Sequence, residues 1–272
     1  MTSITTLLLP AVSQSGTDPR EWEPRSTLIA QLNDCDLAVA IDVLRATSVI
    51  VKALASGAES VMTCATIEQA HRLAESEPDR TLLCGERNCQ KVDGFALGNS
   101  PSEYTSENVH GKRLVLTTTN GTKAIEMASA VPSLAIASFL NLSAVISRIL
   151  RARHTCIICA GTNGVITSED VLLAGALVTG IKNVCEAAQF DDASEISASF
   201  WESSINLDLK DSDQSIALQL ADRLQRTEGG RNLIGVGYEN DLLACSQINS
   251  LPILPMRKAV SPSCFELDNS AR

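Results

Sequence analysis

The chain has no excess of basic residues and no long apolar run. Its 272 residues include 22 Lys and Arg against 32 Asp and Glu, which gives a formal charge of −10. This balance argues against binding to nucleic acid or to an anionic membrane surface, because both favour basic patches. No apolar run reaches the roughly 18 residues of a membrane span, and no basic segment followed by an apolar one opens the chain. We therefore expect a cytoplasmic protein without membrane or nucleic-acid partners.

A second Cys pair and a well-placed histidine are also missing. Cys156 and Cys159 have CxxC spacing, but no other pair or histidine cluster completes a zinc set, and within a strand the two side chains would face opposite sides. The nine cysteines are odd in number and lie mostly in apolar runs, which is typical of reduced core thiols. His71, His110 and His154 fall on a predicted helix, in a loop and before a strand, so none is an obvious catalytic base.

Short apolar runs alternate with segments of helical period. With 44% hydrophobic residues the chain has ample material for a large core. The runs that indicate buried strands are "DLAVAID", "SVMTC", "TLLCG", "RLVLTT", "SLAIAS" and "TCIICAG". This alternation predicts an α/β fold in which helices cover both faces of a mixed, largely parallel sheet, so that three α/β/α layers form.

We expect one domain over residues 1–272. Residues 190–230 contain more Ser, Asp and Glu and no clear strand, so they are predicted to be mostly helical, as a possible subdomain. The tail "LPILPMRKAV" is predicted to form an edge strand or an extended arm. Thr66 with Gln69 has the pattern of a capping box, as does Ser100 with Glu103.

Four polar clusters follow apolar runs at the point where the predicted strands end. They are Asp42 to Arg45 after "LAVAI", "GERN" after "TLLC", "TTTNGT" after "RLVL" and "AGTNG" after "TCIIC". Ligands of open α/β sheets bind at the carboxyl ends of the strands. If these strands are neighbours, the four clusters line one crevice.

Two of these clusters contain the same Thr-Asn-Gly turn. Consecutive N–H groups and hydroxyls at such a turn suit the oxygens of an anion. The alternative is an ordinary strand–turn–helix connection with Gly and a capping residue. Two copies beside acidic residues favour the ligand-binding interpretation. The predicted substrate-binding residues of the turns are Thr118, Thr119, Asn120, Gly121, Thr122, Gly161 and Thr162.

Four acidic residues stand at the edges of apolar segments, where a carboxylate is costly unless it is paired or bound to a cation. They are Asp42, Glu86, Glu169 and Asp170. Carboxylate oxygens suit Mg²⁺, which takes one or two of them together with water and substrate oxygens. The alternatives are that Glu169 and Asp170 are first-turn helix residues favoured by the helix dipole, and that Asp42 pairs with Arg45.

Two arginines and one short polar segment complete the candidate site. Arg45 and Arg87 are placed to bind an anion, or else to serve as structural ion-pair partners. Asn99 and Ser100 in "LGNSP" offer an amide and a hydroxyl, and their alternative role is the capping box already described.

With these motifs in view, the chain resembles the ComB family of 2-phosphosulfolactate phosphatases. The resemblance runs in order through residues 36–257, and its most specific motifs are "GNSP", "TTNGT" and "EDVLLAGA". It implies a homodimeric, Mg²⁺-dependent acid phosphatase that hydrolyses (2R)-2-phospho-3-sulfolactate to 3-sulfolactate and inorganic phosphate. In methanogens that step leads to coenzyme M.

The predicted mechanism is metal-assisted hydrolysis. Some subset of Asp42, Glu86, Glu169 and Asp170 would hold Mg²⁺, with Asp42, Glu86 and Glu169 as the catalytic carboxylates. Attack by water and a phospho-aspartyl intermediate at Asp42 both remain open. The competing hypotheses are a phosphatase for another 2-phospho acid and a non-catalytic protein that binds phospho acids.

Overall fold

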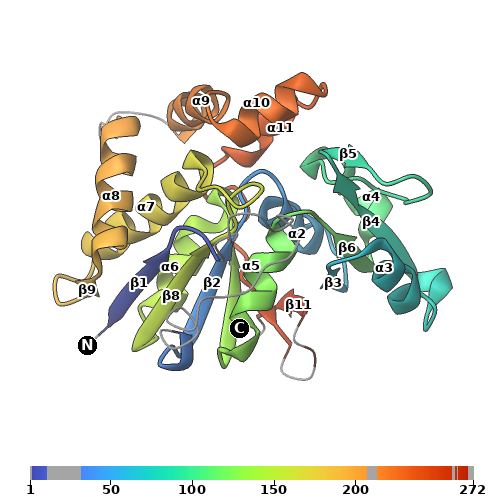
Figure 1. The fold of residues 1–272 in the computed structure, drawn as a ribbon, viewed down its shortest axis with the longest axis horizontal. Coiled ribbons are helices and arrows are strands. Elements are labelled where there is room, and N and C mark those ends of the chain that lie inside the picture. Colours follow the sequence, from blue (N-terminus) through green and yellow to red (C-terminus); the bar gives the residue numbers. More distant parts are fainter. Residues whose placement is uncertain (1, 11–31, 207–212, 259–260, 262, 269–272) are drawn as a thin grey trace, which may run out of the picture.

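The structure is a computed structural model that describes residues 2–10, 32–206, 213–258, 261 and 263–268. Its centre is one mixed sheet of eleven strands in the order β5-β4-β6-β3-β11-β10-β7-β2-β8-β1-β9 (Figure 1). The strands are β1 (Ser3–Leu7), β2 (Leu37–Ile41), β3 (Ser60–Cys64), β4 (Thr81–Arg87), β5 (Gln90–Lys91), β6 (Arg113–Thr117), β7 (Ser133–Ala137), β8 (His154–Cys159), β9 (Gln189–Phe190), β10 (Pro255–Arg257) and β11 (Cys264–Leu267).

Helices occupy most of the connections between these strands. They are α2 (Ala46–Ala55), α3 (Ile67–Ala74), α4 (Ser106–Val109), α5 (Gly121–Met127), α6 (Leu142–Ile149), α7 (Ser168–Lys182), α8 (Asp192–Ser204), α9 (Asp213–Leu224), α10 (Glu228–Gly235) and α11 (Asn240–Cys245). The six strands and the helices between them that the apolar runs predict are all present, so the predicted α/β fold is confirmed.

The sheet consists of two groups of parallel strands, called here the first and the second arm. In the first arm β7, β2, β8, β1 and β9 pair in parallel, and in the second arm β3, β6 and β4 pair in parallel. The hairpin of β10 and β11 joins them through antiparallel pairings to β7 and to β3. In Figure 1 the first arm lies on the left and the second on the right, with α2 and α5 between them.

Side chains of β2 show why both faces of the sheet are covered. Ala38 and Ala40 belong to a core cluster with α2 and α5, whereas Leu37, Val39 and Ile41 belong to a cluster with α6, α7 and α8. The first cluster also contains Leu114 and Leu116 of β6, so α2 and α5 pack against both arms. Helix α3 covers the other face of the second arm. The result is the three-layer α/β/α arrangement.

The C-terminal tail differs from the prediction. We expected an edge strand or an extended arm, but β10 lies inside the sheet between β11 and β7. Proline lacks the N–H that an interior strand needs, but Pro255 occupies the first position of β10, where this loss is tolerated. Leu251 and Ile253 pack against the core cluster of α2 and α5.

Two local predictions are confirmed and one is refined. The Thr66 hydroxyl accepts from Gln69 N, as a capping box requires. Cys156 and Cys159 belong to opposite core clusters, so the CxxC spacing on β8 brings no ligands together. Pro101 begins a 3-10 turn, Pro101–Glu103, rather than an α-helix.

Within the described part of the chain, no helix combines the length and apolar character that crossing a membrane requires.

The predicted helical region after residue 190 is present and packs closely on the rest. Helix α8 lies along α7, and Gly175 of α7 allows this contact because a Cβ at that position would come within 2.0 Å of the Ser197 carbonyl oxygen. Trp201 of α8 stacks on Phe139, with ring centroids 5.8 Å apart. Helices α8 to α11 therefore reach the edge of the sheet where the polar clusters lie.

We expect the substitution Gly175→Ala to destabilise the fold by roughly 1–3 kcal/mol, the usual cost of overpacking. The contact is with backbone, which cannot move aside as a side chain can. Gly180→Ala on the same helix is the matched control, since its Cβ would meet only the end of the Ile146 side chain. Urea unfolding compares the two, and equal stabilities would contradict the close contact of α7 with α8.

Candidate active site

A cavity of about 410 Å³ lies where the loops after β2, β4, β6 and β8 converge. Helix α10 forms the remaining wall. The predicted site residues that line it are Asp42, Arg45, Glu86, Asn99, Thr118, Thr119, Asn120 and Thr162. Those that do not line it are Arg87, Ser100, Gly121, Thr122, Gly161, Glu169 and Asp170.

Asp42 lies directly after β2 and before α2, on the cavity wall. Its Oδ1 accepts from Ala46 N at 3.3 Å, and its own N–H donates to Thr47 Oγ1 at 3.1 Å. Burial raises the pKa of this carboxyl from its ordinary value of 3.8 to about 7, and the negative charges of Glu86 and Glu169 act in the same direction. At neutral pH the protonated and the ionised form of Asp42 are therefore both populated.

Gly121 brings the start of α5 against Asp42. A Cβ at Gly121 would come within 2.7 Å of Asp42 Oδ2 and 2.6 Å of Ala46 Cβ. Only glycine allows the loop after β6 to approach the loop after β2 this closely. Gly121 thus contributes to the shape of the site without lining the cavity.

Glu86, at the end of β4, joins three segments of the cavity wall. Its Oε1 accepts from Thr119 N at 2.8 Å and from Thr119 Oγ1 at 2.9 Å. Its Oε2 accepts from Cys89 N at 2.8 Å. The turn after β6 therefore uses one of its N–H groups to hold the protein's own carboxylate, and this N–H is not free for an external anion.

Asp170 and Glu169 are neighbours in the first turn of α7 but have different surroundings. Asp170 accepts from Val43 N and from Gly161 N, each at 2.9 Å, so it joins the loops after β2 and β8. Burial, with the charges of Asp42 and Glu169, raises the pKa of Asp170 well above its ordinary value. Glu169 is also buried, which raises its pKa, and its Oε2 has no hydrogen-bond partner.

The two Thr-Asn-Gly turns have different conformations and touch each other. The first leads directly into α5, which begins at Gly121. The second is a two-residue hairpin in which Thr162 and Val165 exchange two backbone hydrogen bonds of 3.0 Å, with φ of 51° at Asn163 and 81° at Gly164. Asn163 N donates to Asn120 Oδ1 at 3.2 Å, so the tips of the turns meet beside the cavity.

The two predicted arginines are both engaged by protein groups. Arg45 donates to Asp241 Oδ2 at 2.6 Å and to Cys89 O at 2.8 Å, and its guanidinium lies 4.4 Å from the centre of the Tyr238 ring. Asp42 is therefore not its ion-pair partner. Arg87 donates to the carbonyl oxygens of Glu86 and Ala65 and to the Thr117 hydroxyl, so its guanidinium is directed away from the cavity.

Two buried polar atoms of the cavity wall have no partner in the protein. They are Asn99 Oδ1 and Thr118 Oγ1, on residues that are 5% and 3% exposed. Buried polar atoms are nearly always hydrogen-bonded, so unpaired ones on a cavity wall mark positions for a ligand. The neighbouring Ser100 instead donates its hydroxyl to Asp241 Oδ1 at 2.6 Å.

The C-terminal helices α10 and α11 contribute residues to the site that were not predicted. Gly229, Arg231 and Asn232 of α10 line the cavity, and Asp241 of α11 holds Arg45 and Ser100. These residues follow no strand end, which was the signal that identified the others. Their position depends on how α10 and α11 fold back over the sheet.

Only some of the four predicted carboxylates are placed to bind a metal ion. Among the residues that the structure describes, no three His, Cys, Asp or Glu side chains gather as a metal cluster. Glu169 and Asp170 do not line the cavity. Asp42 and Glu86 do line the cavity, and Mg²⁺ takes as few as one or two carboxylates with water and substrate oxygens. Two carboxylates and the unpaired Asn99 Oδ1 therefore suit it.

Fold and cavity together define a class: an α/β enzyme that binds a small polar ligand at the carboxyl ends of its strands. Residues 24–259 match the protein family described as 2-phosphosulpholactate phosphatase. This match covers most of the chain, which therefore belongs to the 2-phosphosulfolactate phosphatase family, a family of phosphoric monoester hydrolases. The predicted resemblance is confirmed.

Several bacterial relatives agree with this membership. A protein of Thermotoga maritima named probable 2-phosphosulfolactate phosphatase is 40% identical over 222 residues, which cover 82% of this chain and 89% of the relative. Proteins with the same name from Caldanaerobacter subterraneus and a Synechococcus strain are each 36% identical, over 84% and 86% of this chain and 91% and 93% of the relatives.

The substitution Asp42→Asn is expected to stabilise the metal-free protein at pH 8. Because the pKa of Asp42 is raised by folding, the folded state binds its proton more tightly, and stability falls as pH rises from about 4 to about 7. Removing the charge should recover on the order of 4 kcal/mol at pH 8, from a shift of about three pKa units at about 1.4 kcal/mol each, and little at pH 4.

Urea unfolding in EDTA at both pH values measures this difference. Asp36→Asn is the control, because backbone N–H groups of Arg153 and His154 lower the pKa of that exposed carboxyl and its loss should not stabilise at pH 8. Equal stabilities of Asp42→Asn and the unsubstituted protein at pH 8 would refute the raised pKa.

Proposed function

We propose that this protein is a Mg²⁺-dependent phosphatase that hydrolyses (2R)-2-phospho-3-sulfolactate to 3-sulfolactate and inorganic phosphate. Membership of the 2-phosphosulfolactate phosphatase family supports the substrate. The observation that carries the proposal is the cavity in which Asp42 and Glu86 lie beside the unpaired Asn99 Oδ1 and Thr118 Oγ1. The carboxylates would repel an anionic substrate, and a bound cation would offset this repulsion together with Arg45 and Arg231.

Asp42 and Glu86 are the residues that would hold Mg²⁺, with Asn99 Oδ1 as a neutral oxygen. A cation between the two carboxylates would relieve the repulsion by which Glu86 raises the pKa of Asp42. When bound, Mg²⁺ supplies positive charge to the phosphate oxygens and to the developing negative charge of the transition state. Glu169, buried behind α10 with one unpaired oxygen, adds negative charge that favours the cation.

The remaining groups bind and orient the substrate. The Thr118 hydroxyl is free to donate to a phosphate oxygen. Arg45 lines the cavity and uses two of its five N–H donors on Asp241 and Cys89, and its other donors would bind the substrate anion. Arg231 at the rim supplies a second cation for the carboxylate or sulfonate end, and together these contacts fix the phosphate beside Asp42.

Asp42 has two possible parts in the chemical step. Its carboxylate can take a proton from the attacking water, or it can attack phosphorus, displace the sulfolactate oxygen and form an acyl phosphate that water then hydrolyses. Rapid acid quench and mass spectrometry distinguish the two. A phosphoryl group on Asp42 during turnover establishes nucleophilic attack, and its absence in a single turnover establishes attack by water.

Phosphate release from phosphosulfolactate should depend on Mg²⁺ and stop in EDTA. Asp42→Asn should lower kcat by at least about 100-fold, the usual scale for a residue that moves a proton or holds the reacting group. Glu169→Gln should lower it in the same direction. Asp36→Asn, exposed at the far end of β2, is the control and should retain full activity.

Phosphoglycolate and phospholactate serve as comparison substrates in the same assay. Preference for either would assign the enzyme to another 2-phospho acid. Folded protein that releases no phosphate from any of the three with Mg²⁺ present would refute the phosphatase proposal and favour a protein that only binds phospho acids.

We also propose a cytoplasmic homodimer. This part rests on the family resemblance, since β10 and the preceding Leu251 and Ile253 make their contacts within their own chain. Light scattering should give about twice 29.0 kDa. A mass equal to one chain would overturn the dimer and leave the phosphatase proposal unaffected.

A further inference from the structure

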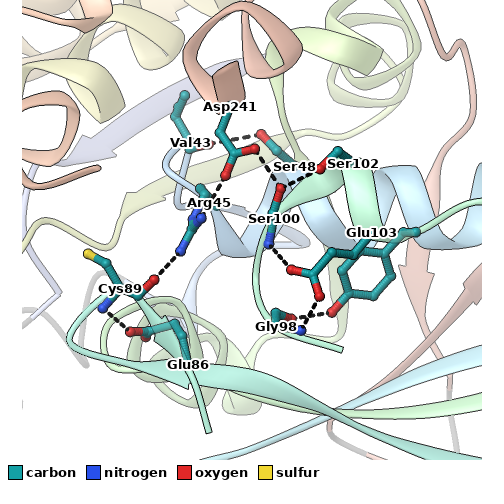
Figure 2. Close-up of polar contacts among 11 residues, drawn as sticks. Val43, Arg45, Ser48, Glu86, Cys89, Gly98, Ser100, Ser102, Glu103 and Asp241 are labelled. Carbon is teal, nitrogen blue, oxygen red and sulfur yellow. Dashed lines mark hydrogen bonds and ion pairs between the residues drawn. The ribbon is translucent and has the colours of Figure 1, made fainter. Parts of the chain in front are cut away.

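Asp241 accepts two short hydrogen bonds from different parts of the cavity wall. Its Oδ2 accepts from Arg45 Nη1 and its Oδ1 from Ser100 Oγ, both at 2.6 Å (Figure 2). All three side chains are only about 2% exposed. Asp241 belongs to α11, whereas Arg45 precedes α2 and Ser100 precedes the 3-10 turn Pro101–Glu103. One buried carboxylate therefore connects three segments.

The segment that carries Ser100 is itself held firmly. Glu103 accepts from Gly98 N at 2.8 Å and from Ser100 N at 3.4 Å, and Tyr104 donates its hydroxyl to Gly98 O at 2.7 Å (Figure 2). Through Ser100, Asp241 is thus hydrogen-bonded to a well-ordered segment on one side. On its other side it holds the guanidinium of Arg45.

From Arg45 the hydrogen bonds continue to the proposed metal-binding carboxylate. Arg45 Nη2 donates to Cys89 O at 2.8 Å, and Cys89 N donates to Glu86 Oε2 at 2.8 Å (Figure 2). Tyr238, three residues before Asp241, supports the other face of the guanidinium. The position of Arg45 in the cavity wall is therefore set by the short segment that leads into α11.

A buried guanidinium without a carboxylate partner would be strongly unfavourable, and it would rotate toward another acceptor. The acidic residues that line the cavity are Asp42 and Glu86, and both would be needed for the cation. The bond to Asp241 keeps Arg45 from pairing with them and leaves its remaining donors for the substrate.

We propose that Asp241 is a positioning residue of the phosphatase reaction: it holds Arg45 in the orientation that binds the substrate anion. This inference rests on the proposed function, since it assigns the substrate contact to Arg45. Asp241 does not touch the substrate. Its loss acts through Arg45, and the main effect is on substrate binding.

A merely structural role would give a different kinetic result. If Asp241 only attached α11 to the core, its loss would reduce the fraction of folded enzyme, which lowers the apparent kcat and leaves KM unchanged. Loss of an anion contact made equally in the ground state and the transition state raises KM and leaves kcat unchanged.

The substitution Asp241→Asn tests this distinction. Asparagine has the same shape and can accept from Arg45 and donate to Ser100, but it lacks the charge that holds the guanidinium. We expect KM for phosphosulfolactate to rise about ten-fold or more, the scale of one charged hydrogen bond, with kcat within about three-fold of the unsubstituted enzyme. The dissociation constant of inorganic phosphate, measured by calorimetry with Mg²⁺, should rise by a similar factor.

Leu242→Ala is the matched control. Leu242 is the next residue of α11, is 5% exposed and packs in the core cluster of α6, α7 and α8, with no bond to Arg45. It should lower the unfolding temperature without changing KM or the phosphate dissociation constant. Ser100→Ala, which removes one of the two bonds to Asp241, should raise KM by a smaller factor of about three.

An Asp241→Asn enzyme with unchanged KM and unchanged phosphate affinity would overturn the positioning role, even if its unfolding temperature falls as in Leu242→Ala. If Asp241→Asn does not fold, Ser100→Ala decides, and an unchanged KM overturns the inference. Unsubstituted protein that binds phosphate but hydrolyses none of the three substrates overturns the proposed function alone. The role of Asp241 is then decided by the phosphate dissociation constants.

Discussion

The two hydrogen bonds that Asp170 accepts from Val43 N and Gly161 N are the constraint on which the site depends. Parallel strands end in separate loops, and one backbone bond, from Ala160 N to Ile41 O at 2.8 Å, extends the pairing of β2 and β8 just past the end of β8. A carboxylate from the first turn of α7 joins both loops through their backbone. Asp42 can then be buried at the cavity wall in one defined place, where its neighbours set its proton affinity.

The site concentrates negative charge in a protein that is already acidic. Asp42, Glu86, Glu169 and Asp170 are all buried near the same edge of the sheet, and the chain carries a net charge of −10. Backbone N–H groups offset part of this cost for Asp170 and Glu86. Burial also raises the pKa of Asp42, Glu169 and Asp170, which favours their uncharged forms. A divalent cation at the cavity would complete the compensation and explain how an anionic substrate enters.

Much of the fold and part of the site followed from the sequence. Asp42, Glu86 and the Thr118–Asn120 turn were predictable because each follows an apolar run, and strand ends meet at one edge of a sheet. Glu169 and Asp170 are adjacent and equally acidic, yet only Asp170 bonds the loops, because the direction of each side chain depends on where α7 starts relative to them. Asp241 was not predictable, since its partners lie about 140 and 196 residues away and meet it only after α11 packs.

The internal position of β10 and β11 has a consequence for biosynthesis. Each arm of the sheet is contiguous in space, but the strands that join the arms come after every other element that the structure describes. While the ribosome is still making this last segment, β3 and β7 both present unpaired backbone edges, which are templates for pairing with another chain. Until β10 and β11 have been synthesised, the edges of β3 and β7 must therefore be kept from pairing with strands of other chains.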